Sequence, residues 1–162
     1  MSKPTLHLMV GLPCSGKTTK AKELEKKHNL IRFTPDEWQL RLFGDDFILD
    51  ERNHNKRHEI IETIMWELAE NLLLKGNDVI LDFGFWAKEE RISFFEKSKA
   101  LNVSFKIHFM EVNLEELLNR LAIRNNDPNY LAFYISEAHM LQWFELFEPV
   151  SEKELDYYVK NE

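Results

Sequence analysis

The stretch GLPCSGKT, residues 11–18, matches the pattern G-x-x-x-x-G-K-[ST], in which backbone N–H groups surround a phosphate. It follows the β-prone, mostly apolar run 5–10 and precedes the run 18–27, which is rich in strong helix formers. A strand, a glycine-bounded loop and a helix start, in that order, direct several N–H groups and the positive end of a helix dipole toward one anion. We therefore predict that residues 11–18, called the phosphate loop below, bind a nucleoside triphosphate.

The side chains of the phosphate loop have separate expected tasks. The lysine of such a loop, here Lys17, reaches the β- and γ-phosphates, and the hydroxyl of Thr18 is a ligand of Mg²⁺. The next residue, Thr19, either packs or touches the α-phosphate, and Cys14 is expected to be a small spacer. The residues expected to bind the nucleotide are therefore Gly11, Pro13, Cys14, Ser15, Gly16, Lys17, Thr18 and Thr19.

Length and composition bound the class of protein. The 162 residues suit a single domain, residues 1–162, and no apolar stretch is long enough to span a membrane. The single cysteine excludes an internal disulfide, so we expect a cytoplasmic protein with no membrane partner. The net charge of −7 argues against an extended nucleic-acid groove and favours a small molecule or a polymer end as substrate. We expect a monomer or a weak dimer.

Apolar runs alternate with helical patterns along the whole chain, which predicts an α/β fold with a parallel sheet and crossover helices. The expected strands are residues 5–10, 30–33, 78–82, 104–110 and 155–159. The expected helices are residues 17–28, 35–42, 51–75, 88–101, 114–125 and 135–147.

Two aspartates follow expected strands and are candidates for the chemistry. Asp82 ends the run 79–82, and a carboxylate at the carboxyl end of a buried parallel strand points into the crevice where such sheets bind ligands. There it either holds Mg²⁺, directly or through water, or is an N-cap or turn residue. Asp36 follows the second strand, beside an expected capping box of Thr34 and Glu37. Asp36 either stabilises the helix dipole or accepts the proton of an attacking hydroxyl, as an aspartate does in kinases.

A pair of arginines is expected to act on the transferred group. Arg120 and Arg124 are four residues apart and share a helix face near its C-terminus. They either complement the helix dipole or donate to the charge that spreads over the γ-phosphate oxygens. The polar loop behind them could close over the site, so residues 120–136 form a candidate lid.

Other polar and aromatic residues are weaker candidates. His54 and His58 have helical metal-ligand spacing, but the run 58–62 lacks the second histidine of H-E-x-x-H, and a surface pair is the better interpretation. Two tryptophans that follow strand ends either line a substrate pocket or pack in the core: Trp38 and Trp86. Three arginines are either substrate contacts or solvated: Arg41, Arg57 and Arg91.

Taken together, the motif of residues 11–18, the Asp36 segment, Asp82, the Arg120-x-x-x-Arg124 pair and the run 147–149 resemble the small P-loop kinases. The similarity is to the group that contains polynucleotide kinase, zeta toxins and chloramphenicol phosphotransferase, and it covers nearly the whole chain. It implies a three-layer P-loop NTPase fold with a five-stranded parallel sheet of order 2-3-1-4-5 and a short helical lid.

The resemblance also implies residue roles. Lys17 and Thr18 would take the triphosphate and Mg²⁺, and Asp36 would be the base for the acceptor hydroxyl. Arg120 and Arg124 would be lid arginines, and the segment that ends at Pro149 would border the nucleobase. The run after Asp82 is Phe-Gly-Phe-Trp, which differs from the ending typical of polynucleotide kinases. This difference bears on the class of substrate more than on the type of reaction.

The function that these features favour is an ATP-dependent phosphotransferase, with GTP as an alternative donor and a hydroxyl of a small molecule or nucleotide-like compound as acceptor. One alternative is a zeta-like toxin kinase that acts on a nucleotide sugar. Another is a nucleotide-dependent switch or ATPase that is not a kinase. Against a switch, the run 55–58 does not complete the guanine-reading Asn-Lys-x-Asp pattern, and Phe83 stands where ATPase motors carry a water-activating glutamate.

Overall fold

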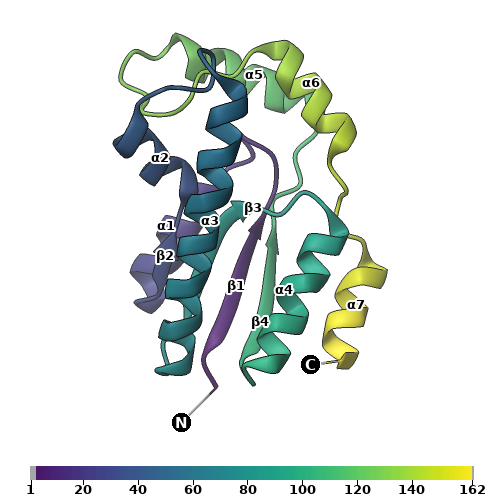
Figure 1. Cartoon of the computed structure of the whole chain (residues 1–162). Coiled ribbons are helices and arrows are strands. Elements are labelled where there is room, and N and C mark those ends of the chain that lie inside the picture. The colour runs from purple at the N-terminus through teal and green to yellow at the C-terminus, as the bar shows by residue number, and fades with distance from the viewer. Residues whose placement is uncertain (1–2, 162) are drawn as a thin grey trace.

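The computed structural model describes residues 3–161, and its centre is a parallel sheet. The strands are β1 (Thr5–Val10), β2 (Ile31–Phe33), β3 (Val79–Gly84) and β4 (Ser104–Phe109), in the spatial order β2-β3-β1-β4. All neighbouring strands pair in parallel, so their carboxyl ends meet at one edge (Figure 1). Open parallel sheets bind ligands outside this edge.

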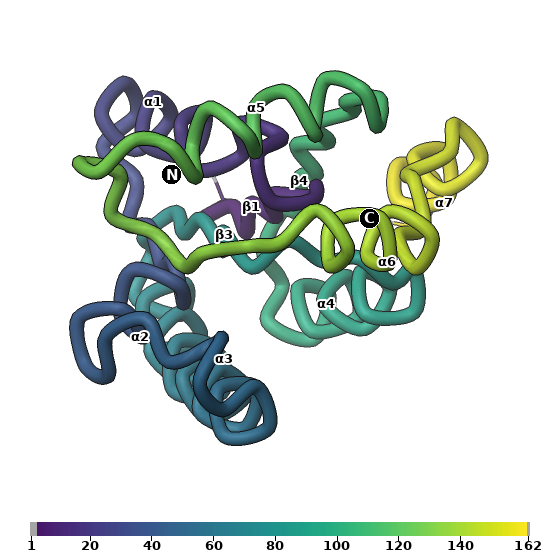
Figure 2. Tube along the Cα trace, turned by 90° about the horizontal axis from the view of Figure 1, so that it is seen from above, coloured from purple at the N-terminus to yellow at the C-terminus, as the bar shows by residue number. Residues whose placement is uncertain are grey.

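Seven helices accompany the strands within the described residues. They are α1 (Lys17–His28), α2 (Pro35–Phe43), α3 (Glu51–Leu74), α4 (Lys88–Ala100), α5 (Leu114–Asn126), α6 (Glu137–Leu146) and α7 (Glu152–Asn161). Seen from above, α1 and α5 lie on one side of the strands and α3 and α4 on the other (Figure 2). The structure therefore has the three layers expected of this α/β class.

The core forms on both faces of the sheet because both faces are covered by helices. Met9 of β1 packs with Ala21 of α1 on one face. Its neighbour Leu8 points to the other face, where Met65 of α3 and Phe94 of α4 belong to the same cluster. Successive strand residues point to opposite faces, so an apolar run without alternation is what a sheet buried on both sides requires.

The prediction of a fifth strand at residues 155–159 is wrong, because this segment belongs to α7. Leu155, Tyr157 and Val159 alternate as in a strand, yet all three are exposed. The buried side chains are Glu154 and Tyr158, which are four residues apart and therefore share one helix face. Among residues 3–161 the sheet accordingly has four strands instead of five, in the order 2-3-1-4.

All the other expected elements are confirmed, with ends that differ by at most two residues. The largest difference at a helix start is at α6, expected from residue 135. It begins at Glu137 because the hydroxyl of Ser136 accepts a hydrogen bond from the backbone N–H of His139, which caps the helix.

A buried ion pair attaches α7 to the rest of the molecule. The guanidinium of Arg91 in α4 donates to both carboxylate oxygens of Glu154, over 2.7 and 2.8 Å, and both side chains are fully buried. Nη1 of Arg91 also donates to the carbonyls of Phe85, Trp86 and Glu148. Arg91, a weak candidate for substrate binding in the sequence, is thus occupied by the protein itself.

Replacing one member of this pair should destabilise the fold strongly, because the other charge would remain buried without its partner. We expect Glu154→Ala to lower the free energy of unfolding by about 3–5 kcal/mol. Glu152→Ala, on the exposed side of the same helix, should change it by less than about 0.5 kcal/mol. Urea denaturation of both variants measures the difference, and equal midpoints would contradict a structural role for the pair.

Candidate active site

The phosphate loop connects β1 to α1 through a backbone with several unusual torsion angles. Cys14 and Gly16 have left-handed backbone angles, with φ of 66° and 91°, between residues of ordinary conformation. Such alternation creates an anion-binding concavity. A side chain at Gly11 would place its Cβ 2.6 Å from Oγ of Ser15, so the loop requires glycine there. The loop thus has the local geometry that its motif predicts.

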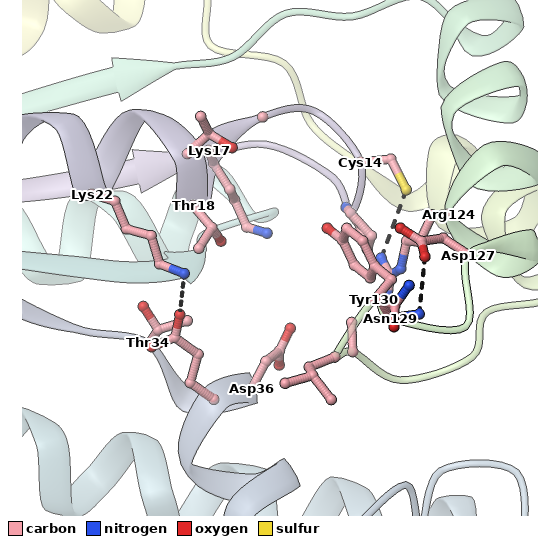
Figure 3. A pocket seen from close by; sticks show the side chains of 16 residues that line it. Cys14, Lys17, Thr18, Lys22, Thr34, Asp36, Arg124, Asp127, Asn129 and Tyr130 are labelled. Atoms are coloured by element: carbon pink, nitrogen blue, oxygen red, sulfur yellow. Dashed lines mark hydrogen bonds and ion pairs between the residues drawn. The ribbon is translucent and has the colours of Figure 1, made fainter.

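A cavity of about 460 Å³ opens over the phosphate loop, and we call it the first cavity. Figure 3 shows Lys17 and Asp36 reaching into it from opposite sides, Thr18 and Thr34 on one flank and Arg124 with Tyr130 on the other. Among the residues expected to bind nucleotide, those that line it are Pro13, Cys14, Gly16, Lys17, Thr18 and Thr19. Three stretches that are distant in sequence, residues 13–22, 34–37 and 124–132, therefore converge on one space.

Asp82 lies near the end of β3, next to Thr18 of the phosphate loop, and is buried. Its Oδ2 accepts hydrogen bonds from the hydroxyls of Thr18, over 2.7 Å, and Thr34, over 3.1 Å. Its Oδ1 is buried and has no partner among residues 3–161. Burial raises the pKa of Asp82 above its ordinary value, which the charge of Lys17 and the two hydroxyls only partly oppose. An orphaned carboxylate oxygen beside a hydroxyl fits a hydrated Mg²⁺.

Mg²⁺ is usually held by one or two carboxylates together with water and substrate phosphates, rather than by a cage of side chains. In the part of the chain that the structure describes, no group of three or more His, Cys, Asp and Glu side chains converges as a metal site. The Thr18–Asp82 pair is therefore the arrangement to test for this ion.

The expected capping box at the start of α2 is wrong. The hydroxyl of Thr34 makes no cap hydrogen bond, because it donates to Asp82 and accepts from the guanidinium of Arg32. Arg32 also donates to Glu25 and Glu37, over 2.9 and 3.1 Å. These contacts fix the segment between β2 and α2 against the phosphate-loop side of the molecule, and this segment leads directly into Asp36.

Asp36 belongs to a row of ionisable side chains that spans α2 and α3. Oδ1 of Asp36 lies 3.1 Å from Nε2 of His58, whose Nδ1 lies 3.4 Å from Oε1 of Glu62. Desolvation works to raise the pKa of Asp36, but the hydrogen bond with His58 and the charges of Lys17, His58 and Arg124 lower it below its ordinary value. Asp36 is therefore an ionised carboxylate at the floor of the first cavity.

The interpretation of His54 and His58 as a surface pair is wrong. Burial works to lower the pKa of His58, yet Asp36 and Glu62 raise it above its ordinary value. His54 is buried, with Nδ1 2.7 Å from Oδ1 of Asp46 and 2.9 Å from Nε2 of Gln39. His54 therefore joins α3 to the α2–α3 connection, whereas His58 contacts the candidate base.

Arg124 and Arg120 have different positions, although they share a helix face. Nη1 of Arg124 lies 3.7 Å from Sγ of Cys14, its Nη2 donates to the carbonyl of Phe133, and its guanidinium is 5.3 Å from the centre of the Tyr130 ring. Nη1 of Arg120 donates to the carbonyl of Cys14 over 3.2 Å, outside the cavities described in this section. Arg124 thus faces the first cavity, and Arg120 holds the phosphate loop from outside.

The connection between α5 and α6, the second half of the candidate lid, covers one side of the first cavity. Asn125 donates from its amide to the carbonyl of Ile135, and the backbone N–H of Tyr134 donates to Asp45. Both ends of the connection are therefore anchored, while residues 127 and 129–132 line the cavity.

A second cavity, also of about 460 Å³, lies on the other side of Asp36. It shares four residues with the first cavity: Pro13, Lys17, Asp36 and Arg124. Its remaining lining comes from the end of β3, from α3, α4 and α6, and from the loops before these helices. The sequence did not single out most of these residues, because Glu62 and Glu90 carry no motif and look like ordinary polar positions of amphipathic helices.

The other candidates are distributed around these cavities. Trp86 lines the second cavity, while Trp38 packs against the core beside Phe33. Arg57 donates to Asp46, and Arg41 is exposed on α2.

Pro149 lies in a third cavity, of about 760 Å³, which reaches the phosphate loop at Leu12 and Ser15. This cavity lies beside Met110, at the end of β4, rather than beside Asp36. The prediction that Pro149 borders the nucleobase therefore concerns this third space and stays a prediction.

No helix among the described residues is long and apolar enough to cross a membrane. A family model described as an AAA domain, AAA_33, matches residues 6–150, which is most of the chain. No curated protein matches the chain.

Solved structures show where the same fold occurs. A chain of the Pnkp1/Rnl/Hen1 RNA repair complex is 19% identical, with a TM-score of 0.68, and the alignment covers 100% of this chain and 47% of that one. This protein thus spans about half the length of that relative. A protein of Chloroflexus aurantiacus J-10-fl described as a "putative kinase" is 19% identical, with a TM-score of 0.63 and coverage of 81% and 74%.

A gluconokinase from Sinorhizobium meliloti 1021 is 12% identical, with a TM-score of 0.62 and coverage of 91% of this chain and 77% of that one. At these identities the similarity establishes the fold, and the family match establishes the membership. The chain belongs to the AAA domain family AAA_33 and has the three-layer α/β fold of the P-loop kinases.

Proposed function

We propose that this protein is a phosphotransferase that moves the γ-phosphate of ATP, or alternatively of GTP, to a hydroxyl group of a small molecule. The observation that carries the proposal is the position of Lys17, Asp36 and Arg124, which line both the first and the second cavity. A triphosphate in the first cavity and an acceptor in the second would meet at these three side chains.

Asp36 is the group that activates the acceptor. Its carboxylate is ionised and open to both cavities, with 59% of the side chain exposed, so an acceptor hydroxyl can donate a hydrogen bond to it. As the acceptor oxygen forms its bond to the γ-phosphorus, the bond between that phosphorus and the β–γ bridging oxygen breaks and the nucleoside diphosphate leaves. The hydroxyl proton passes to Asp36.

Lys17 and Arg124 supply positive charge where negative charge develops. Lys17 reaches the β- and γ-phosphates from the start of α1, and Arg124 approaches from the lid side, next to Cys14. Arg120 fixes the loop through the carbonyl of Cys14 and acts on the reaction only through that position. The residues that would hold Mg²⁺ are Thr18 and Asp82, and the ion would neutralise phosphate charge during transfer.

Variants of Lys17 and Asp36, which line both cavities, separate nucleotide binding from transfer. We expect Lys17→Ala to abolish turnover, because the phosphates lose their cation. We expect Asp36→Asn to keep nucleotide binding and to lose transfer by about 10²–10⁴-fold, because the amide cannot take the proton. The measurement is transfer of labelled γ-phosphate to nucleosides, nucleotide sugars, aminoglycosides and oligonucleotide ends, together with calorimetry for binding.

The exposed lysine Lys20 provides a matched control, since Lys20→Ala on the same helix should leave turnover within about twofold of wild type. Normal transfer by Asp36→Asn would refute the base assignment. Fast release of γ-phosphate without any acceptor would instead indicate a nucleotide-hydrolysing switch.

Removal of the Asp82 carboxylate should abolish the contribution of magnesium to nucleotide affinity. We expect Mg²⁺ to tighten ATP binding to the wild type by at least about tenfold, or 1.4 kcal/mol, and to have no effect in Asp82→Asn. Asp78→Asn is the control, because Asp78 precedes β3 at its opposite end and binds the N–H of Thr5. Calorimetry with and without Mg²⁺ measures the ATP affinity of both variants. An equal magnesium effect in the two would show that Asp82 does not hold the ion.

The acid limb of the pH–rate profile should depend on His58. Because His58 lowers the pKa of Asp36, wild-type Asp36 stays ionised below the ordinary aspartate range. In His58→Asn the pKa of Asp36 should rise, so the acid limb of kcat/KM should move to higher pH while the rate at alkaline pH changes little. His28→Asn, at an exposed position of α1, is the control. An unchanged limb in His58→Asn would show that His58 does not set the ionisation of Asp36.

A further inference from the structure

The second cavity, which the proposed function assigns to the acceptor, has aromatic walls. Its aromatic lining consists of Phe47, Phe83, Phe85, Trp86, Phe133 and Trp143. The rings support each other, since Phe83 and Phe85 stack with centroids 5.4 Å apart and Trp86 lies 5.5 Å from Trp143. A concave, largely apolar space with a few polar groups is typical of a small-molecule site, and its volume lies within the usual range of such pockets.

The charged residues of this cavity are arranged unevenly. Within the described part of the chain, the lysine and arginine that line it are Lys17 and Arg124, which also line the first cavity and would face the transferred phosphate. The remaining acidic residues in its lining are Asp36, Glu51, Glu62 and Glu90. Its two histidines are already paired with carboxylates, His54 with Asp46 and His58 with Asp36 and Glu62. An acceptor that carries a phosphate or carboxylate would therefore find no free cation on this side and would approach several like charges.

Glu62 and Glu90 are incompletely paired with other protein groups. Among residues 3–161, the only ion-pair partner of Glu62 is His58, 3.4 Å away, and His58 is shared with Asp36. Glu90 has no hydrogen bond or ion pair among residues 3–161. Burial raises the pKa of Glu62 to about 7, and Glu90 and Asp36 add to the increase, although His58 opposes it. Burial also raises the pKa of Glu90.

A cation in this cavity would relieve both carboxylates, and aromatic faces bind cations favourably when water is excluded. We propose that the acceptor is an amino alcohol, whose protonated amine binds between Glu62 and Glu90, whose apolar body packs on the aromatic walls, and whose hydroxyl reaches Asp36. This inference rests on the proposed function, because it assigns the substrate class of the same site. It disfavours nucleotide sugars and polynucleotide ends, which bring anions.

Binding can be measured without knowledge of the natural acceptor, because Trp86 and Trp143 line the cavity and report its occupation by fluorescence. Three probes share a phenyl body and a hydroxyl: phenylalaninol carries an ammonium, hydrocinnamyl alcohol is neutral and phenyllactate is an anion. Each is titrated into the full chain with ADP and Mg²⁺ present. We expect phenylalaninol to bind at least about tenfold more tightly than hydrocinnamyl alcohol, and phenyllactate to bind most weakly.

Carboxamide variants test the two glutamates. Glu62→Gln and Glu90→Gln should each weaken phenylalaninol binding by about five- to tenfold and leave hydrocinnamyl alcohol unchanged. Glu89→Gln, at the exposed neighbouring position of α4, should change neither probe. Both test variants remove a desolvated charge, so they should fold at least as stably as the wild type.

The pH dependence provides an independent readout. Asp36 of α2, His58 and Glu59 of α3 and Glu90 of α4 act on the ionisation of Glu62. Phenylalaninol affinity should therefore rise as the pH increases through about 7, where Glu62 loses its proton, and this rise should vanish in Glu62→Gln.

The outcomes distinguish the two proposals. Equal or tighter binding of the neutral or anionic probe, or no response to phenylalaninol while ATP binds in a Lys17-dependent manner, would overturn the amino-alcohol assignment and leave the phosphotransferase proposal intact. Preferential binding of phenylalaninol by a protein that does not bind ATP would overturn the phosphotransferase proposal instead.

Discussion

The arrangement of the site depends on the hydrogen bonds that the carboxylate of Asp82 accepts. The carboxylate accepts them from Thr18 at the start of α1 and from Thr34 at the end of β2, so one buried group connects three segments distant in sequence. Its position follows from the parallel sheet, which brings the ends of β1, β2 and β3 to one edge. Because Thr34 leads into α2, the same contact sets where Asp36 stands relative to the phosphate loop.

Electrostatics divide the site into two parts. The first cavity is positively charged over the phosphate loop, because Lys17, Arg124 and the dipole of α1 face it. Such charge would stabilise a bound triphosphate. Carboxylates gather beyond Asp36, in the second cavity. His58 connects the two parts, since it contacts Asp36 on one side and Glu62 on the other. A change of charge in either cavity should therefore alter the pKa of the candidate base Asp36.

Two buried polar networks hold the walls of the second cavity in place. Arg91 binds Glu154, and it also donates to the backbone carbonyls of Phe85 and Trp86. These hydrogen bonds fix the loop that carries Trp86. The second network fixes the connection between α2 and α3, because His54 contacts Asp46 and Gln39 there and packs against Phe47. Burying polar groups is costly unless they are hydrogen-bonded, and most groups of these networks are, although Oε1 of Gln39 has no partner among residues 3–161. The networks thereby help to position the aromatic residues of the cavity walls.

The sequence by itself determined the phosphate loop, the α/β class and, to within two residues, the ends of every element except α7. These features depend on local patterns: glycine spacing, strand apolarity and helix periodicity. It misassigned residues 155–159, since exposed Leu155 and Val159 imitate a strand and only the distant Arg91 explains why Glu154 is buried. It also missed the contact of His58 with Asp36 and the joint position of Glu62 and Glu90. Those are decided by the packing of α2, α3 and α4 around one edge of the sheet, and no local sequence signal records which side chains that packing brings within a few ångströms of each other.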